Sequence, residues 1–188
     1  MPLFGRDPAR QILDLSIIGV VTIDEHNRVT YFNRAAERLW GYQSREVIGR
    51  NVDMLVPPEH KDHHDALIDH HRRTGEDRIV GTSREVQMER RDGTRLWVDL
   101  ALSKIAVGNK THYSAFVRDV TAERQQRQMI EQTLEQALDA VVTIDENNEV
   151  IFFNAAAERL WGYDRDEVLG RNVAMLVPAA HQAHHDDY

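Results

Sequence analysis

The sequence predicts an α+β fold, in which a five-stranded antiparallel sheet carries helices on one face. Two short β-branched runs are followed by several short helical segments and then by three longer segments of alternating polarity. In addition, residues 20–64 recur almost unchanged at 141–185. The two copies start 121 residues apart (141 − 20), which is too long for a solenoid repeat and indicates tandem domains. We therefore expect one complete domain followed by the truncated first half of a second.

The first part of the domain reads as a helix, a hairpin and two short helices. Asn33 stands at an N-cap position and Gly41 at the end of the helix that follows it. These elements are predicted at Gln11–Ile18, Gly19–Asp24, Arg28–Asn33, Ala35–Trp40 and Ser44–Val47.

A longer helix and three strands are expected to complete the domain. Pro57-Pro58 opens the helix and Gly75 ends it, so that it covers about Glu59–Arg73. Alternating polarity then predicts three antiparallel strands at Arg78–Arg90, Arg95–Ile105 and His112–Val120.

The segment Ala122–Ala140 is polar, lacks Gly and Pro, and has apolar residues near a three-and-four spacing. It predicts a helical connector that pairs with a second copy of itself in a homodimer. The alternative is a solvated helix that packs on its own domain. We divide the chain accordingly into an N-terminal helical cap, a complete domain, a helical linker and a half domain, at 1–17, 18–121, 122–140 and 141–188.

The composition excludes several classes of function. A net charge of −8, with basic residues scattered among acidic ones, disfavours a nucleic-acid partner. The chain has no cysteine, which excludes disulfides, thiolate ligands and a cysteinyl-flavin photoreceptor. No apolar run is long enough to span a bilayer, and no signal-peptide pattern opens the chain. We expect a cytoplasmic protein with no membrane span in this segment.

The motifs resemble those of PAS sensor domains. The resemblance covers roughly residues 12–121, and residues 138–188 match the first half of a second such domain. It rests on the Asn-x-Ala-Ala-Glu-x-Leu-x-Gly-Tyr segment at 33–42, on Gly49-Arg50-Asn51, on Arg91-Asp92-Gly93 and on Asp119-Val120-Thr121. The resemblance implies the PAS fold for the predicted sheet and helices.

A subset of motifs is similar to the haem-binding PAS domains, which include FixL-type oxygen-sensing kinases and direct-oxygen-sensor cyclic-di-GMP phosphodiesterases. The motifs are Met54-Leu55-Val56-Pro57, His64-Asp65, Thr74-Gly75 and Ile79-Val80-Gly81-x-x-Arg84. This resemblance implies haem b, with His64 as the proximal iron ligand and Arg84 as the hydrogen-bond donor to bound dioxygen. It also implies that Ile79, Leu100 and Leu102 crowd the distal face.

One departure concerns the sixth iron ligand, which in the phosphodiesterase-type sensors is a methionine at the position of Thr82. Threonine cannot supply a thioether, so we expect five-coordinate iron as in FixL-type sensors. We also expect Leu67 and Ile68, which follow His64 on the same predicted helix, to contact the cofactor.

Spacing alone does not choose the ligand, because five histidines lie on the predicted helix: His60, His63, His64, His70 and His71. The resemblance selects His64 and leaves His70 in reserve. Three of the five also satisfy the i, i+3, i+4 pattern of a zinc site, although no third-ligand carboxylate stands at a known catalytic spacing.

We therefore expect a sensory module for O2, CO or NO, whose signal leaves through the linker helix to an output domain. A chemoreceptor is favoured over a histidine kinase or a cyclic-di-GMP domain, by resemblance alone. No paired acid–base carboxylates and no Gly-rich phosphate loop are present, so we do not expect an enzyme in this segment. Two alternatives stay open: a cofactor-free PAS dimerisation module and a PAS domain that senses redox through FAD.

Overall fold

The computed structural model describes residues 8–74, 80–108 and 110–178, and it divides into two units, Met1–Ala122 and Glu123–Tyr188. The elements of the first unit are α1 Pro8–Leu15, β1 Gly19–Ile23, β2 Val29–Phe32, α2 Arg34–Trp40, α3 Ser44–Val47, the 3-10 helix η1 Val52–Leu55, α4 Pro58–Thr74, β3 Ser83–Glu89, β4 Arg95–Val107 and β5 Lys110–Asp119. Those that follow are α5 Thr121–Glu135, β6 Val142–Ile144, β7 Val150–Phe153, α6 Ala155–Trp161, α7 Arg165–Val168 and η2 Val173–Leu176.

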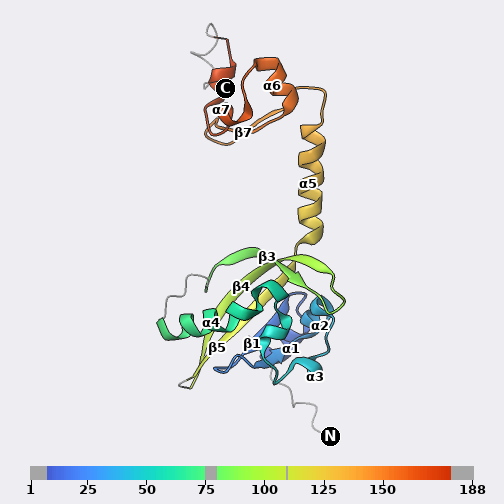
Figure 1. The fold of residues 1–188 in the computed structure, drawn as a ribbon, viewed down its shortest axis with the longest axis vertical. Helices are drawn as coiled ribbons and strands as arrows, with labels where there is room; N and C mark the ends of the chain where they lie inside the picture. Colours follow the sequence, from blue (N-terminus) through green and yellow to red (C-terminus); the bar gives the residue numbers. More distant parts are fainter. Residues whose placement is uncertain (1–7, 75–79, 109, 179–188) are drawn as a thin grey trace. The chain divides into compact units, whose positions relative to one another are not determined.

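The first unit contains the predicted five-stranded antiparallel sheet, in the order β2-β1-β5-β4-β3. One face of the sheet carries α2, α3, η1 and α4, and α4 crosses it over β4 and β5 (Figure 1). The core between these layers is built from residues such as Val47, Leu55, Met88, Val98 and Val117. The predicted fold class is confirmed.

Local polar contacts explain why the first elements begin and end where they do. Asn27 adopts a positive φ of 58° in the turn between β1 and β2. The side chain of Asn33 accepts a hydrogen bond from the N–H of Ala36 and caps α2, which ends at Gly41 with a φ of 79°. The cap and the end of this helix agree with the prediction.

The strand β3 starts later than predicted, at Ser83 rather than Arg78. Gly81 has a φ of 79°, and Val80 just before it makes an isolated parallel bridge to Leu102 of β4. The chain therefore turns at Gly81 before it enters the antiparallel ladder. Residues 78 and 79 lie outside the described part of the chain.

Among the described residues of α4, none is fully buried. The helix is held largely by polar contacts at three levels along its length. Glu59 pairs with Arg95 of β4, Asp65 accepts a hydrogen bond of 2.6 Å from Asn51, and Arg72 reaches the β1–β2 hairpin. Only Ile68 packs against the core cluster from this helix.

The second unit repeats the first elements of the fold, with β6 and β7 paired as β1 and β2 are. Asn154 caps α6 and also donates to the carbonyl oxygens of Leu134 and Asp139. These carbonyls correspond to those of Leu13 and Ile18, which accept from Asn33 in the first unit. The end of α5 is thus the counterpart of α1.

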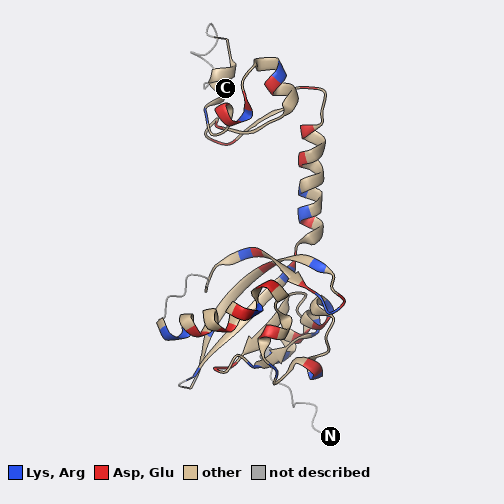
Figure 2. Cartoon of the chain, viewed as in Figure 1, with Lys and Arg blue, Asp and Glu red and all other residues tan. Residues whose placement is uncertain are grey.

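None of the helices in the described residues is long and apolar enough to cross a bilayer. Figure 2 shows Lys and Arg interleaved with Asp and Glu along the elements, in agreement with the scattered charges of the sequence.

Candidate functional site

The structure separates the histidines of α4, which spacing alone could not do. His60, His63 and His70 are exposed, whereas His64 and His71 are partly buried. The ring of His71 makes an edge contact with that of His70 at 6.1 Å. By contrast, Nδ1 of His64 is buried and has no hydrogen-bond partner among the described residues. His64 is therefore the histidine of this helix with a buried nitrogen that still needs a partner.

The surroundings of His64 favour a neutral imidazole. Burial lowers its pKa from the ordinary value of 6.5, and the positive charges of Arg84 and His60 lower it further. The carboxylates of Asp65 and Asp53 act in the opposite direction without reversing the effect. A neutral imidazole is the form that binds a metal.

Arg84 approaches this histidine from the sheet. It stands on β3 two and four positions before Val86 and Met88, and Met88 is 4% exposed in the core. Because side chains alternate along a strand, Arg84 projects from the same face as Met88. Its positive charge contributes to the lowered pKa of His64, and its own side chain is exposed.

The predicted apolar wall lies beside Arg84. Leu100 is the direct register partner of Arg84 in the β3–β4 ladder, and Leu102 stands opposite Ala115 of β5. Leu100 and Ala115 pack against the core cluster. On the helix side Ile68 packs against the same cluster, whereas Leu67 is 47% exposed.

Ile79 lies outside the described residues. We call the set of His64, Ile68, Arg84, Leu100 and Leu102 the α4–sheet site.

The zinc alternative has no support in the described residues. Among them, no group of three or more His, Asp or Glu side chains lies close enough to hold a metal ion. His60 and His63 are exposed, whereas His64 is partly buried, so the three rings do not gather around one point.

One interaction at the site is not evident from the sequence. Asn51, the N-cap of η1, donates from its amide nitrogen to Asp65 at 2.6 Å while its oxygen accepts from the N–H of Asp53. This contact anchors the turn of α4 that carries His64 to the preceding 3-10 helix. The Gly49-Arg50-Asn51 motif marked Asn51 but gave no indication of its partner.

These residues fit a haem. A neutral imidazole on α4 with an unpartnered buried nitrogen, and an apolar strand face with a cation beside it, are groups with which a protein can hold a haem. His64 would hold the iron through a ring nitrogen, and Leu100 and Leu102 would make apolar contacts with the porphyrin.

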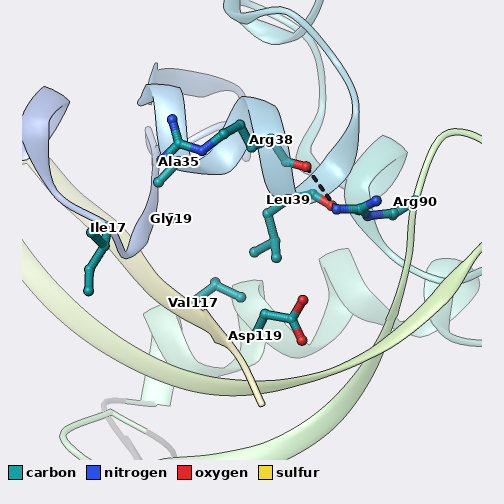
Figure 3. Close-up of a pocket in the computed structure, with 8 residues that line it drawn as sticks. All are labelled: Ile17, Gly19, Ala35, Arg38, Leu39, Arg90, Val117 and Asp119. Carbon is teal, nitrogen blue, oxygen red and sulfur yellow. Dashed lines mark hydrogen bonds between the residues drawn. The ribbon is translucent and has the colours of Figure 1, made fainter. Parts of the chain in front are cut away.

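A separate pocket of about 180 Å³ lies between Ile17 and Gly19, which follow α1, the helix α2 and the end of β5 (Figure 3). Apolar Leu39 and Val117 line it together with the carboxylate of Asp119. Arg90 crosses its edge and donates to the backbone oxygens of Arg38 and Leu39 at 3.0 Å each. None of the predicted cofactor residues that the structure describes lines this pocket.

The chain matches the family described as PAS fold over residues 9–120 and 128–188. It is 38% identical over 169 residues to the oxygen sensor protein DosP of Escherichia coli, which covers 88% of this chain and 21% of that protein. It is 37% identical over 129 residues to the sensor protein FixL of Bradyrhizobium diazoefficiens, covering 69% of this chain and 25% of that protein. The chain therefore spans a fifth to a quarter of these two curated relatives.

Two solved structures extend the comparison. A PAS domain from Colwellia psychrerythraea superimposes with a TM-score of 0.51 at 22% identity, covering 61% of this chain and 95% of that chain, and supports the fold alone. An RNA-binding Light-Oxygen-Voltage receptor gives a TM-score of 0.53 at 26% identity, covering 71% of this chain and 40% of that chain.

Proposed function

The chain belongs to the PAS family, and from this premise we propose that its first unit binds haem b through His64 and senses a diatomic gas such as O2, CO or NO. The observation that carries the proposal is the orientation of His64, whose buried Nδ1 lacks a partner in the described residues. The similarity to DosP, named as an oxygen sensor, supports the same assignment.

Each residue of the α4–sheet site has a role in this proposal. When bound, haem would supply the iron to which the gas ligates. His64 holds the metal with its neutral ring, and the lowered pKa protects that ring from protonation. Leu100 and Leu102 exclude water from the opposite face. Arg84 offers N–H donors on the sheet side, and a bound gas that can accept a hydrogen bond is stabilised by them more than one that cannot.

Paired residues connect Arg84 to the start of α5, so a movement of Arg84 on ligand binding can be transmitted to that helix. Arg84 pairs with Leu100 of β4, and Leu100 pairs in turn with Val117 of β5. Two residues later Asp119 accepts a hydrogen bond from the N–H of Thr121, the first residue of α5. A ligand can shift the equilibrium only by its differential affinity for two states, so the Arg84 contact has to differ between them.

We take residues 18–121 as the sensing domain and 122–140 as the relay to an output domain, which by resemblance is a chemoreceptor, a histidine kinase or a cyclic-di-GMP domain. Met129 and Ile130 of α5 are 69% and 52% exposed. We propose that they pair with the same helix of a second copy in a homodimer, since exposed apolar residues on a polar helix are typical of a helix–helix interface.

The test is an absorption spectrum of the purified protein after haem is supplied, in ferric, deoxy-ferrous, O2 and CO states. We expect a Soret band that shifts with each gas, stoichiometric uptake in the wild type and loss of this uptake in His64→Ala. The matched control is His63→Ala, which removes an exposed histidine from the neighbouring position of α4. Uptake that is indifferent to His64, or absent, would overturn the proposal.

An FAD-binding unit is the second candidate, and the similarity to a Light-Oxygen-Voltage receptor favours it. A cysteinyl adduct is excluded because the chain has no cysteine. Non-covalent FAD would give yellow protein with flavin fluorescence, whereas a cofactor-free dimerisation module would give colourless protein that takes up neither haem nor flavin.

A further inference from the structure

Two side chains that contact each other near the C-terminal end of α4 each carry a buried polar atom without a partner in the described residues. These atoms are Nε of Arg72 and the hydroxyl of Tyr113, and neither has a hydrogen-bond partner among the described residues. The guanidinium carbon of Arg72 lies 5.7 Å from the centre of the Tyr113 ring, so the two groups are in contact. Buried polar groups in folded proteins are rarely left without a partner, and two side by side indicate that something binds between or beside them.

Arg72 is held in place by its other nitrogens. Nη1 pairs with Asp69 at 2.7 Å, and Nη2 donates to the carbonyl of Asp24 and the side chain of Asn27 at 3.2 and 3.0 Å. Its side chain is only 17% exposed. These contacts fix the guanidinium against the β1–β2 hairpin and leave Nε buried, as a preorganised donor.

Tyr113 presents the second group from the sheet. It is 7% exposed and belongs to the core cluster against which Ile68 and Leu100 pack. Its register partner across the β4–β5 ladder is Lys104, which adds a second cationic residue to this end of the sheet. A tyrosine hydroxyl and a guanidinium N–H both donate hydrogen bonds, so the group that satisfies them together is an acceptor, and an anion is favoured by the charge.

His64 in the middle of α4 and Arg72 near its C-terminal end are spaced for a single ligand. His64, Ile68 and Arg72 follow at intervals of four on the partly buried edge of the helix. Eight residues of helix correspond to about 12 Å, which is of the order of the reach from the centre of a porphyrin to its carboxylate arms. Ile68 stands between the two positions and packs against the core cluster.

We propose that Arg72 and Tyr113 form a subsite for a carboxylate group of the bound cofactor, with Nε–H and the hydroxyl as its donors. The proposal rests on the proposed function, because it takes the cofactor to be a porphyrin dicarboxylate held at His64.

The experiment compares binding of haem and of haem dimethyl ester, whose carboxylates are esterified, to the cofactor-free protein. In the wild type we expect the ester to bind about tenfold more weakly, the size of one charge-assisted hydrogen bond. In Tyr113→Phe, haem binding weakens toward that of the ester and the difference between the two ligands shrinks. Arg72→Gln reduces the difference between the two ligands further, although this substitution also loosens the contact of α4 with the β1–β2 hairpin.

A second readout needs no cofactor. Tyr113→Phe removes a buried hydroxyl for which the described residues offer no partner, so the unfolding midpoint of the cofactor-free protein stays unchanged or rises. The matched control is Tyr31→Phe, because the Tyr31 hydroxyl donates to Asp14 at 2.7 Å. That substitution lowers the midpoint and leaves the preference for haem over its ester intact.

The outcomes separate the two proposals. Haem uptake that depends on His64, with no preference over the ester or a preference that Tyr113→Phe leaves unchanged, overturns the carboxylate subsite alone. A fall in the midpoint of Tyr113→Phe also overturns it, because the hydroxyl would then have a structural partner. Uptake of neither porphyrin overturns both proposals.

Discussion

The first unit and the second unit make the same local contacts around equivalent tryptophans. Trp40 and Trp161 each donate from the indole nitrogen at 3.0 Å, to the carbonyl oxygens of Leu55 and Leu176 respectively. Their rings lie 5.8 and 5.9 Å from those of a preceding phenylalanine. Yet Trp40 is 6% exposed and Trp161 is 37% exposed.

The neighbouring leucines differ more. Leu39 is 8% exposed, whereas Leu160 at the same position of the repeat is 67% exposed. The difference comes from β3, β4 and β5, which contribute Met88, Val98 and Val117 to the core of the first unit. In the described part of the second unit the sheet consists of β6 and β7. Short-range sequence thus determines the local structure of both units, and the three long strands determine burial.

The largest contrast is expected at the two tryptophans. Trp40→Ala should destabilise the first unit by about 4 kcal/mol, because a buried aromatic ring is lost. Trp161→Ala should cost the second unit less than about half of that, since the ring is already partly in water. Hydrogen exchange of amides in each unit measures both losses separately, and equal losses would contradict the comparison.

The two leucines are expected to differ by a larger factor than the two tryptophans, although the loss of unfolding free energy is smaller. We expect Leu39→Ala to lower the free energy of unfolding by about 3 kcal/mol, as for a buried leucine. Leu160→Ala should remain within about 0.5 kcal/mol of the wild type, as for a surface residue. Urea unfolding followed by circular dichroism tests the pair, and a loss at Leu160 close to that at Leu39 would show that this residue is buried in solution.

Gly19 packs closely against β5, and the second unit has Ala140 at the same position of the repeat. A Cβ at Gly19 would lie 3.3 Å from the carbonyl oxygen of Val117 and 3.4 Å from Cα of Ala36. We expect Gly19→Ala to destabilise the first unit by about 1 kcal/mol through overpacking. Thermal unfolding measures the change in midpoint. A lower midpoint supports the close contact, whereas a higher one would contradict it, because without that contact alanine stabilises the unit by restricting the unfolded chain.

The smallest effect concerns an ion pair that also needs β5. Glu25, in the β1–β2 turn, pairs with Lys110 at 2.5 Å, and its hydrogen bond to Lys110 lowers its pKa from 4.5 to about 2. The stabilisation is therefore complete above pH 4.5 and is lost as the pH falls toward 2. Glu25→Gln should flatten the pH dependence of the unfolding midpoint in this window. An unchanged acid limb would show that the pair contributes nothing, and high salt should weaken the effect.

Most of the fold could be predicted from local signals. Asn33 and Gly41 mark the ends of α2 in the sequence because capping and left-handed termination depend on neighbouring residues. The start of β3 could not be predicted, because the turn at Gly81 depends on a bridge between Val80 and Leu102. That bridge joins residues 22 positions apart (102 − 80).

The site was predictable to a lesser degree. The resemblance indicated His64, but the contacts that distinguish it from His63 and His70 follow from how α4 lies on the sheet. The pairing of Arg72 with Tyr113 joins α4 to β5 across a long stretch of sequence, and no spacing rule predicts such a contact. The proposed carboxylate subsite could therefore be recognised only from the three-dimensional structure.

The central claim is that the ring nitrogen of His64 is the group that holds the cofactor. The most direct measurement is the ferrous haem spectrum of His64→Gly with and without free imidazole, beside the same experiment on His63→Gly. We predict that His64→Gly loses the wild-type deoxy spectrum and regains it when imidazole occupies the vacated space, whereas His63→Gly keeps it throughout. A His64→Gly protein with an unaltered spectrum, or one that imidazole does not change, would contradict the account.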